Sequence, residues 1–351
     1  MTVSRRTFLR SSALVAGAAL STRVVGAAPP AEAITPALIE AARREGKLAF
    51  YTAMDLPVAE RFAKAFEAKF SGIAVRVERS GAERVFQRIG QEYTSNIRVV
   101  DVVNTADGAH MIVWKRNGWL GAYVPEDVAR HFPAQYHDPD GMSALTRVWL
   151  SSLGYNTNLV KAEDAPKSFA DLLDPKWMGK MVKGHPGYSG AILTATFVLA
   201  RDLGWPYLEK LAQQKVMQVQ SAADPPKKIL LGERAVMADG NDYNLVLLKD
   251  QGKPVEVVYP AEGSPLIIVP SGIFRSAPNP NAARLFQSFF FSAETQQMLV
   301  DVFAHRSFHG QVKEKGEHVP LSTLKLLKAD PAQVQAQSEE IKARYTKIFG
   351  V

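Results

Sequence analysis

The stretch M-A-D-G-N-D-Y-N at residues 237–244 gathers polar side chains between two apolar runs. Within six residues it supplies carboxylate, amide and phenol groups, from Asp239, Asn241, Asp242, Tyr243 and Asn244. Hard oxygen donors of this kind suit a metal ion, and the same groups can bind a small polar solute. A plain turn has a similar composition. Taken alone, the stretch leaves a metal site, a solute site and a turn open.

Composition limits the class of protein. The chain has 351 residues, of which 46% are apolar and 22% are charged, as expected for a globular protein with a core large enough for two domains. It contains no cysteine, which excludes disulfides, thiolate metal sites, cysteine nucleophiles and a lipid-modified N-terminal cysteine.

The first 28 residues predict an export signal. Arg5 and Arg6 begin a basic segment, an apolar stretch covers 13–20, and small residues surround Ala27. The apolar stretch is too short to span a bilayer. S-R-R-T-F-L at 4–9 resembles the twin-arginine signal, while an ordinary secretory signal is the alternative. Both predict an exported protein, and we expect a periplasmic one.

Removing this segment changes the charge of the chain. Residues 1–28 hold four arginines and no acid, so the mature chain carries 38 basic and 35 acidic residues, a net charge of +3 instead of +7. The mature chain has no long basic run, so we expect no nucleic-acid partner. Outside the signal, no apolar run is long enough for a membrane span.

Strand and helix patterns alternate along the chain. Strands are predicted at 48–52, 73–77 and 99–103, each followed by a helix, the last over 108–117. One helix carries an apolar face with a spacing of four, formed by Val58, Phe62, Phe66 and Phe70. This order is typical of a parallel, doubly wound α/β sheet.

A strand-like run at 147–156 leads into a second unit of the same kind, and another at 266–275 leaves it. From about 281 the chain is mostly helical, with an apolar face formed by Ala283, Phe286, Phe289 and Phe290. If these helices pack on the first unit, the chain crosses between units near 150 and near 260. Two crossings predict a hinge with a ligand cleft between the units.

Several local patterns resemble a known family. They are L-A-F-Y-T-A-M-D at 48–55, G-Y-N-T-N-L-V at 154–160, S-F-A-D-L-L-D-P-K-W-M-G-K at 168–180, H-P-G-Y-S-G at 185–190 and S-P-L-I-I-V-P-S-G-I at 264–273. Together they resemble, over about 35–310, the periplasmic solute-binding proteins of ABC importers, in the branch named after ferric iron.

The resemblance implies a two-lobe α/β fold of type II, in which each lobe is a doubly wound sheet and two hinge crossings join the lobes. We expect lobe 1 to comprise 35–152 plus 262–351, and lobe 2 to comprise 153–261. It further implies a monomer that carries a small-molecule solute to ABC permease and ATPase subunits, with no catalysis and no cofactor.

Candidate ligand residues follow from the fold class, because ligands bind where parallel strands end and helices begin. In the first lobe the loops offer Thr52, Met54, Asp55, Ser80, Gly81, Asn104 and Asp107. In the second lobe they offer Tyr155, Tyr188, Ser189, Gly190, Asp239, Asn241, Asp242 and Tyr243. As an alternative, Ser80, Ser189 and Asp107 serve only to cap helices.

The ligand class depends on the turn at 237–244. Ferric binders of the family carry two adjacent tyrosines there, and this sequence has one, Tyr243. This difference favours a small polar or anionic organic solute over iron. Ferric iron is the alternative, with Tyr243, Tyr155 and Asp242 as its ligands. In a further alternative, Tyr243 lies inside the lobe.

Other motifs are weaker. His305 and His309 have a helical zinc-ligand spacing, but H-R-S-F-H lacks the metalloprotease glutamate, and we expect surface histidines. An exported hydrolase is the remote alternative. Ser322 and Lys325 match S-x-x-K without its partner motifs, and the second glycine of 187–191 comes one residue early for G-x-S-x-G.

Overall fold

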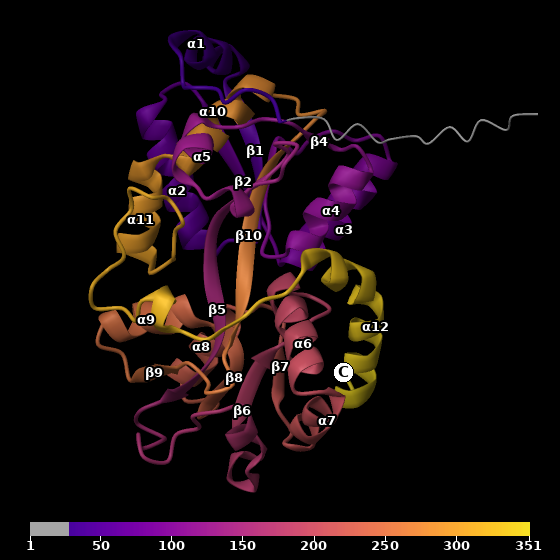
Figure 1. The fold of residues 1–351 in the computed structure, drawn as a ribbon, viewed down its shortest axis with the longest axis vertical. Coiled ribbons are helices and arrows are strands. Elements are labelled where there is room, and N and C mark those ends of the chain that lie inside the picture. Colours follow the sequence, from indigo (N-terminus) through magenta and orange to yellow (C-terminus); the bar gives the residue numbers. More distant parts are fainter. Residues whose placement is uncertain (1–27) are drawn as a thin grey trace, which may run out of the picture.

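The computed structural model describes residues 28–351, in which two groups of helices and strands are joined by two long strands (Figure 1). The predicted export signal at 1–28 lies almost entirely outside the described residues. Within 28–351, no helix is both long enough and apolar enough to cross a bilayer.

The first half contains four strands and seven helices. Its strands are β1 (Lys47–Thr52), β2 (Ala74–Arg79), β3 (Val102–Asn104) and β4 (Leu120–Gly121). Its helices are α1 (Pro36–Glu45), α2 (Leu56–Lys69), α3 (Ala82–Thr94), α4 (Gly108–Arg116), α5 (Glu126–His131), α10 (Pro280–Phe291) and α11 (Ala293–Phe303).

The second half contains four strands and four helices. Its strands are β6 (Met181–Gly184), β7 (Met217–Val219), β8 (Val236–Asn241) and β9 (Val255–Val258). Its helices are α6 (Gly190–Asp202), α7 (Trp205–Gln213), α8 (Asp224–Leu230) and α9 (Asp242–Asp250). Short 3₁₀ turns lie at Ala134–Tyr136, Ala170–Leu173, Pro175–Trp177 and Leu321–Thr323.

Two long strands, β5 (Ala144–Asn156) and β10 (Ser264–Phe274), are shared by the halves. They pair antiparallel, with Leu150 opposite Leu266, and β5 then continues into pairing with β8 and β9. The strand path is therefore continuous, in the order β2-β1-β3-β10-β5-β8-β6-β7. The predicted crossings near 150 and 260 correspond to these two strands.

Most of the parallel pairing lies in the interior of each half, apart from the short pairing of β10 with β11 (Leu326–Leu327). β1 lies between β2 and β3, and β6 lies between β7 and β8, with all four pairings parallel. Helices cover both faces, because consecutive residues of one strand enter different core clusters. Phe50 packs with α2 and α10, whereas Tyr51 packs with α3 and α4.

The first-half core confirms the two predicted apolar faces. Val58, Phe62, Phe66 and Phe70 are all buried, as are Ala283, Phe286, Phe289 and Phe290. The two faces pack against each other, with ring centroids 4.9 Å apart for Phe62 and Phe286 and 5.5 Å apart for Phe66 and Phe289. Aromatic pairs at these distances add to the burial of apolar surface.

Two segments differ from the sequence-based expectation. The strand predicted at 99–103 is only Val102–Asn104. Just before it, the buried Asp101 carboxylate, instead of a backbone carbonyl, accepts the Ala49 N–H (2.7 Å). The chain after α11 is also less helical than expected, because Ala304 adopts a left-handed conformation (φ 53°) that ends the helix.

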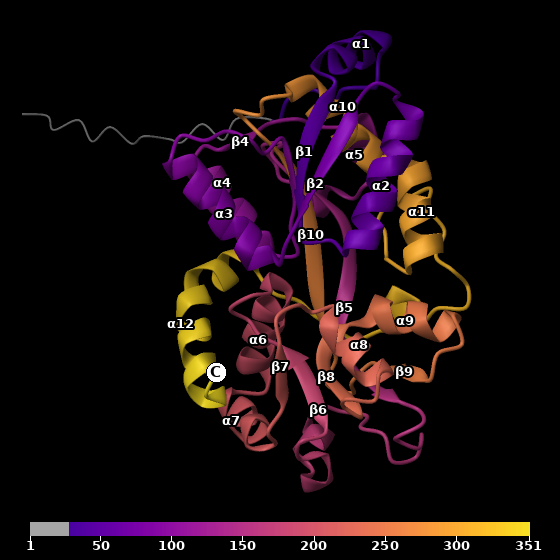
Figure 2. The same ribbon diagram turned by 180° about the vertical axis from the view of Figure 1, so that it is seen from behind.

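The last helix, α12 (Pro331–Phe349), does not stay with the first half, where residues 262–351 were expected. It follows the short strand β11 (Leu326–Leu327), which pairs with the start of β10. α12 then runs beside α6 and α7 of the second half, with its beginning near α4 (Figures 1 and 2).

Phe62→Ala should lower the free energy of unfolding by about 3–5 kcal/mol, because the ring is fully buried among other phenylalanines. Urea denaturation followed by circular dichroism measures the change. Leu231→Ala is the control, since Leu231 is 71% exposed, and it should change stability by less than about 0.5 kcal/mol. Equal effects of the two substitutions would contradict this core.

Candidate ligand-binding site

The turn at 237–244 is a junction between a strand and a helix, where β8 ends at Asn241 and α9 begins at Asp242. From this junction two side chains reach across to the first half. The Tyr243 hydroxyl donates to Asp55 Oδ2 (3.2 Å), and Asn244 Nδ2 donates to the same oxygen (2.9 Å). Asp55 follows β1, so two of the predicted site residues meet from opposite halves.

The amide of Asn241 connects this group. Its Nδ2 donates to the Tyr243 hydroxyl (2.8 Å) and to Asn244 Oδ1 (2.9 Å). Its Oδ1 is buried and has no hydrogen-bond partner among residues 28–351. A buried acceptor without a partner is costly, so this oxygen is available to a donor on a ligand.

Arg79, at the end of β2, also reaches across the boundary. Its Nε donates to the Met54 carbonyl (3.2 Å), and its Nη2 lies 3.4 Å from Ser221 Oγ in the second half. The guanidinium is 3.9 Å from Asp55 Oδ1. Arg79 therefore brings a positive charge to the same group of side chains.

A second guanidinium is buried at the base of the site. Arg147 on β5 is 3% exposed, and its Nη1 donates to Asn104 Oδ1 (2.9 Å). It forms no ion pair within the described chain, and its buried Nε has no partner there. Burial lowers its pKa to about 10, while the nearby Tyr243 and Asp55 act in the opposite direction. Arg147 is therefore charged at neutral pH.

His305 lies against the same tyrosine. Its ring centroid is 4.2 Å from that of Tyr243, and neither ring nitrogen has a partner within residues 28–351. Burial lowers the pKa of His305 well below its usual value, and Arg147 lowers it further. The ring is neutral at pH 7 and can both donate and accept a hydrogen bond.

The expectation of surface histidines with helical spacing is wrong. His305 and His309 are both 2% exposed, and α11 has already ended at Phe303. The two histidines are buried because the chain after α11 packs against the rest of the protein. Their spacing in the sequence cannot predict this packing.

Three other predicted residues have their polar groups directed elsewhere. Asp239 is 1% exposed, accepts from the Ser151 hydroxyl and lies 3.6 Å from Lys183 Nζ. The Asp242 carboxylate accepts the Leu150 N–H (2.9 Å). Tyr155 packs in a separate apolar cluster of the second half. The structure does not bring these groups to Tyr243.

Two predicted loop residues cap helices. The Asp107 carboxylate accepts the Ala109 N–H (2.8 Å) at the start of α4, and Ser189 caps α6. Ser80 forms no cap, because α3 begins after Gly81 without a side-chain cap bond.

The remaining predicted residues line the boundary between the halves. Thr52 Oγ1 accepts the Met54 N–H (3.0 Å), which shapes the loop that carries Asp55. A Cβ on Gly81 would lie 2.6 Å from the Tyr188 carbonyl oxygen, and one on Gly190 would lie 2.6 Å from Asp107 Cβ. The backbone of Gly81 therefore lies against the backbone of Tyr188, and the backbone of Gly190 lies against the Asp107 side chain.

Sequence reasoning missed Arg79, Arg147, Ser221, Asn244 and His305. Arg79 and Arg147 lie in strands, where a charge usually indicates the solvent face. Arg147 did carry a signal, since it interrupts a run of residues that otherwise reads as a buried strand. Asn244 lies within the polar stretch itself, one residue after Tyr243.

The fold, two α/β halves joined by two long strands, is that of periplasmic binding proteins. The chain belongs to the family of bacterial extracellular solute-binding proteins, whose sequence model matches residues 101–333. Membership in this family also agrees with the expectation that the chain is not an enzyme.

Known relatives are distant in sequence. A "Probable ABC transporter periplasmic-binding protein" of Sinorhizobium fredii is 23% identical and aligns over 80% of each chain. A "Putative 2-aminoethylphosphonate-binding periplasmic protein" of Salmonella typhimurium is 27% identical over 74% of this chain and 76% of its own.

Solved structures show the same fold. The periplasmic binding protein AfuA from Actinobacillus pleuropneumoniae, with exogenous fructose-6-phosphate bound, aligns with a TM-score of 0.79 at 22% identity, covering 87% of this chain and 99% of its own. Iron-bound HitA from Pseudomonas aeruginosa aligns with a TM-score of 0.73 at 22% identity, covering 85% and 99%.

Asp239→Asn should destabilise the protein by about 3 kcal/mol, because it leaves the buried Lys183 ammonium without its carboxylate. Thermal or urea unfolding measures the loss. Asp301→Asn, on the exposed surface, is the matched control and should have an effect below about 0.5 kcal/mol. Unchanged stability in Asp239→Asn would show that Asp239 is not a structural group.

Proposed function

We propose that this protein is the periplasmic substrate-binding component of an ABC importer and that it binds a small anionic organic solute between its two halves. The halves then act as two lobes of a type II binding-protein fold, lobe 1 with 35–152 plus 262–330 and lobe 2 with 153–261, while α12 runs beside lobe 2. β5 and β10 form the hinge. Asp55, Arg79, Asn241, Tyr243 and Arg147 hold the solute.

The buried charge of Arg147 carries the proposal. A guanidinium removed from water is costly unless an anion compensates it, and no carboxylate among residues 28–351 forms an ion pair with it. Arg79 adds a second positive charge, opposed by the one carboxylate of Asp55. The balance of charge favours an anionic ligand, and guanidinium groups suit phosphate, phosphonate and carboxylate oxygens.

The names of the relatives support the same class of ligand. One is named for 2-aminoethylphosphonate, and one similar structure contains fructose-6-phosphate. Both ligands combine an anionic phosphorus group with a small polar body. In this chain the neutral donors and acceptors of Asn241, Tyr243 and His305 would contact that body.

The proposed function also describes how the solute would reach the importer. Contacts from both lobes favour the closed state when solute is present, and the closed protein would dock on a permease driven by an ATPase. The proposed protein is a monomer, exported by the twin-arginine route that S-R-R-T-F-L at 4–9 predicts.

Ferric iron is the second candidate, and the 3.2 Å contact between the Tyr243 hydroxyl and the Asp55 carboxylate favours it, because both groups are oxygen ligands. The other expected ligands, Tyr155 and Asp242, lie apart from this pair. Two nearby guanidiniums also oppose a trivalent cation.

Native mass spectrometry of protein purified from its source should show a co-purified organic anion. The solute identified in this way is then titrated by calorimetry into solute-free protein. We expect Arg147→Met to weaken its binding by about 100-fold or more, since a buried charged contact is worth roughly 2–5 kcal/mol.

Arg147→Met should not lower the melting temperature of the solute-free protein, because it removes a buried charge that has no ion-pair partner. Arg130→Met is the control, because the Arg130 side chain is 67% exposed, and it should bind the solute as the wild type does. Undiminished binding in Arg147→Met would refute the assigned role.

Addition of ferric salt to the solute-free protein should give no visible tyrosinate absorption and no saturable heat, because Tyr243 is the one tyrosine in the apolar cluster that the described residues form around it. A red-orange band that Tyr243→Phe abolishes would instead establish the iron alternative.

A further inference from the structure

The last helix connects the two halves. At its start, Pro331 lies beside α4, where a Cβ on Gly108 would be 3.0 Å from the proline ring. Along its length, Val334 and Ile341 pack in one apolar cluster with Leu193 of α6 and Ala109 of α4. Figures 1 and 2 agree that α12 covers α6 and reaches up to α3 and α4.

Two side chains of α12, one turn apart, bind opposite halves. Lys342 Nζ donates to Glu83 Oε2 of α3 (2.6 Å) in the first half. In the second half, the Tyr345 hydroxyl accepts from Lys183 Nζ (2.9 Å) and donates to Gln218 Oε1 (2.6 Å). Residues three apart lie on the same helix face, so one face of α12 contacts both halves.

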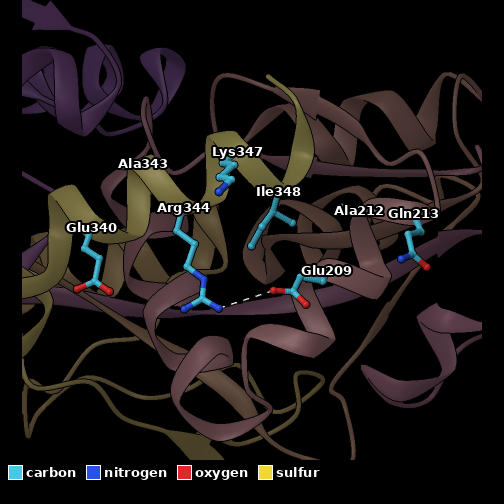
Figure 3. Close-up of a pocket in the computed structure, with 8 residues that line it drawn as sticks. All are labelled: Glu209, Ala212, Gln213, Glu340, Ala343, Arg344, Lys347 and Ile348. Carbon is cyan, nitrogen blue, oxygen red and sulfur yellow. Dashed lines mark ion pairs between the residues drawn. The ribbon is translucent and has the colours of Figure 1, made fainter.

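The opposite side of α12 makes no comparable contact with the first half among the described residues. It borders a groove with α7, where Arg344 faces Glu209 at 3.7 Å (Figure 3). Both side chains are more than 40% exposed, and exposed ion pairs contribute little to stability. Lys347, in the same groove, forms no ion pair within the described chain and supplies a matched control.

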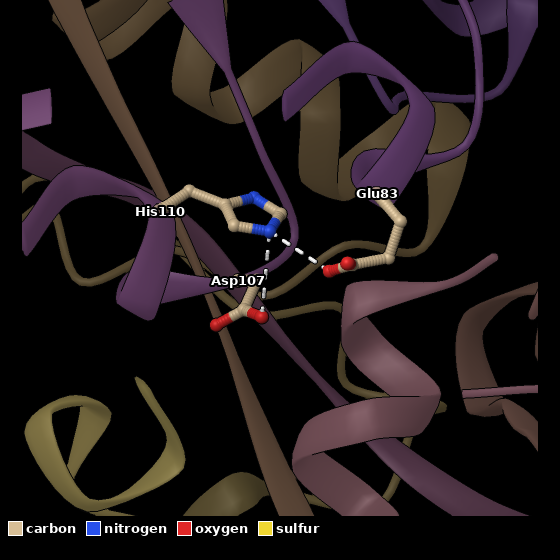
Figure 4. A group of neighbouring side chains, drawn as sticks. All are labelled: Glu83, Asp107 and His110. Atoms are coloured by element: carbon tan, nitrogen blue, oxygen red, sulfur yellow. Dashed lines mark hydrogen bonds and ion pairs between the residues drawn. The ribbon is translucent and has the colours of Figure 1, made fainter. Parts of the chain in front are cut away.

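Lys342 reaches a buried cluster of titratable groups. His110 Nε2 lies 2.9 Å from Glu83 Oε1 and 3.7 Å from Asp107 Oδ2 (Figure 4). All three side chains are at most 4% exposed, and Asp107 Oδ2 has no hydrogen-bond partner among residues 28–351. The His110 Nδ1 lies 2.9 Å from Thr105 Oγ1.

The second half completes the burial of this cluster. Gly190, the first residue of α6, lies so close that a Cβ there would be 2.6 Å from Asp107 Cβ. Movement of α6 and α12 away from the first half would expose Asp107 and separate Lys342 from Glu83. The cluster is therefore fully assembled only when the two halves are together.

We propose that α12 is an intramolecular lock, in which Lys342 pairs with the buried Glu83–His110–Asp107 cluster and holds the solute-free protein partly closed. Lys342 is a positioning residue, because it acts on solute binding through the distance between the halves. The proposal rests on the proposed function, since closure has this meaning only if solute binds between the halves. Its first test requires no solute.

The test uses the absence of cysteine from the chain. Cysteines introduced at the exposed residues Glu60 of α2 and Lys210 of α7 carry spin labels, and electron–electron double resonance reports the distance between the halves. Without solute, we expect the wild type to show a closed population that Lys342→Met reduces at least fivefold. Lys342→Arg should retain it, and Lys347→Met should match the wild type.

A double-mutant cycle distinguishes the effect of the Lys342–Glu83 ion pair from a general disruption of α12. If the lock is the Lys342–Glu83 pair, Glu83→Gln and Lys342→Met together should change the closed population no more than the larger single effect. Additive effects would refute the pairing. A wild type with no closed population, or a closed population unchanged in Lys342→Met, would refute the lock even if the protein binds solute.

The lock also predicts a pH dependence. Burial raises the pKa of Asp107 to about 6. Burial lowers the pKa of His110, but Asp107 and Glu83 raise it more, so the net shift is upward. The groups that raise the pKa of His110 both lie in the first half, so they stay beside it when the halves separate. The carboxylate of Asp107, in contrast, loses its burial against Gly190, so it binds its proton more tightly when the halves are together. Closure is therefore favoured at low pH and weakens as pH rises through about 6.

The remaining charged groups near the cluster titrate outside this range. His110 and Lys342 overcome the effect of burial and lower the pKa of Glu83 to about 2. Glu83 and Glu339 likewise outweigh burial and raise the pKa of Lys342. The closed population should therefore fall as pH rises through about 6, and its midpoint should move to higher pH in Lys342→Met, because the ammonium lowers the pKa of Asp107. A flat profile would contradict the assignment.

The same three side chains have the donor types of a divalent cation site. Zinc titration of the solute-free wild type and His110→Gln distinguishes the two uses of the cluster. We expect no saturable binding, because Lys342 already supplies the positive charge. Binding of one zinc ion that His110→Gln abolishes would assign the cluster to a metal and refute the lock.

Discussion

The antiparallel pairing of β5 with β10 is the constraint on which the rest of the structure depends. These strands are the long connections between the two halves, and each is almost entirely buried. Because they carry the chain across and back, the polar ends of β1, β2 and β3 face the end of β8. Asp55 can therefore meet Tyr243, nearly 190 residues later in the chain. Arg147 lies on β5 itself, so its charge is fixed at the base of this boundary.

Much of the fold could be predicted from sequence, because the strongest patterns are local. The faces of α2 and α10 repeat at helical spacing, and burying both requires them to meet. The path of α12 could not be predicted in this way. Its apolar residues Val334, Ile341 and Tyr345 form a narrow face, and nothing local says which helices that face contacts.

The candidate site was predictable only in part. Strand ends and helix starts indicated the loops that carry Asp55 and Tyr243, and the structure brings these two side chains together. They did not separate Asp239 from Asn241, which are two residues apart on β8. A register shift in the pairing of β8 with β5 falls between Gly240 and Met237, a segment that includes Asp239, so simple alternation does not apply there. Asp239 turns to Lys183, whereas Asn241 turns to Tyr243.

The polar stretch at 237–244 therefore serves two purposes. Asp239 and Asp242 hold strands and loops of the protein together, whereas Asn241, Tyr243 and Asn244 face the other half. Each of these two carboxylates has a cation nearby. Lys183 Nζ lies 3.6 Å from Asp239 Oδ2, and Arg306 Nη2 lies 3.7 Å from Asp242 Oδ2. Arg147 has no such partner within residues 28–351, although it is just as deeply buried. This difference between the compensated carboxylates and the uncompensated guanidinium is the physical basis of the proposed anionic ligand.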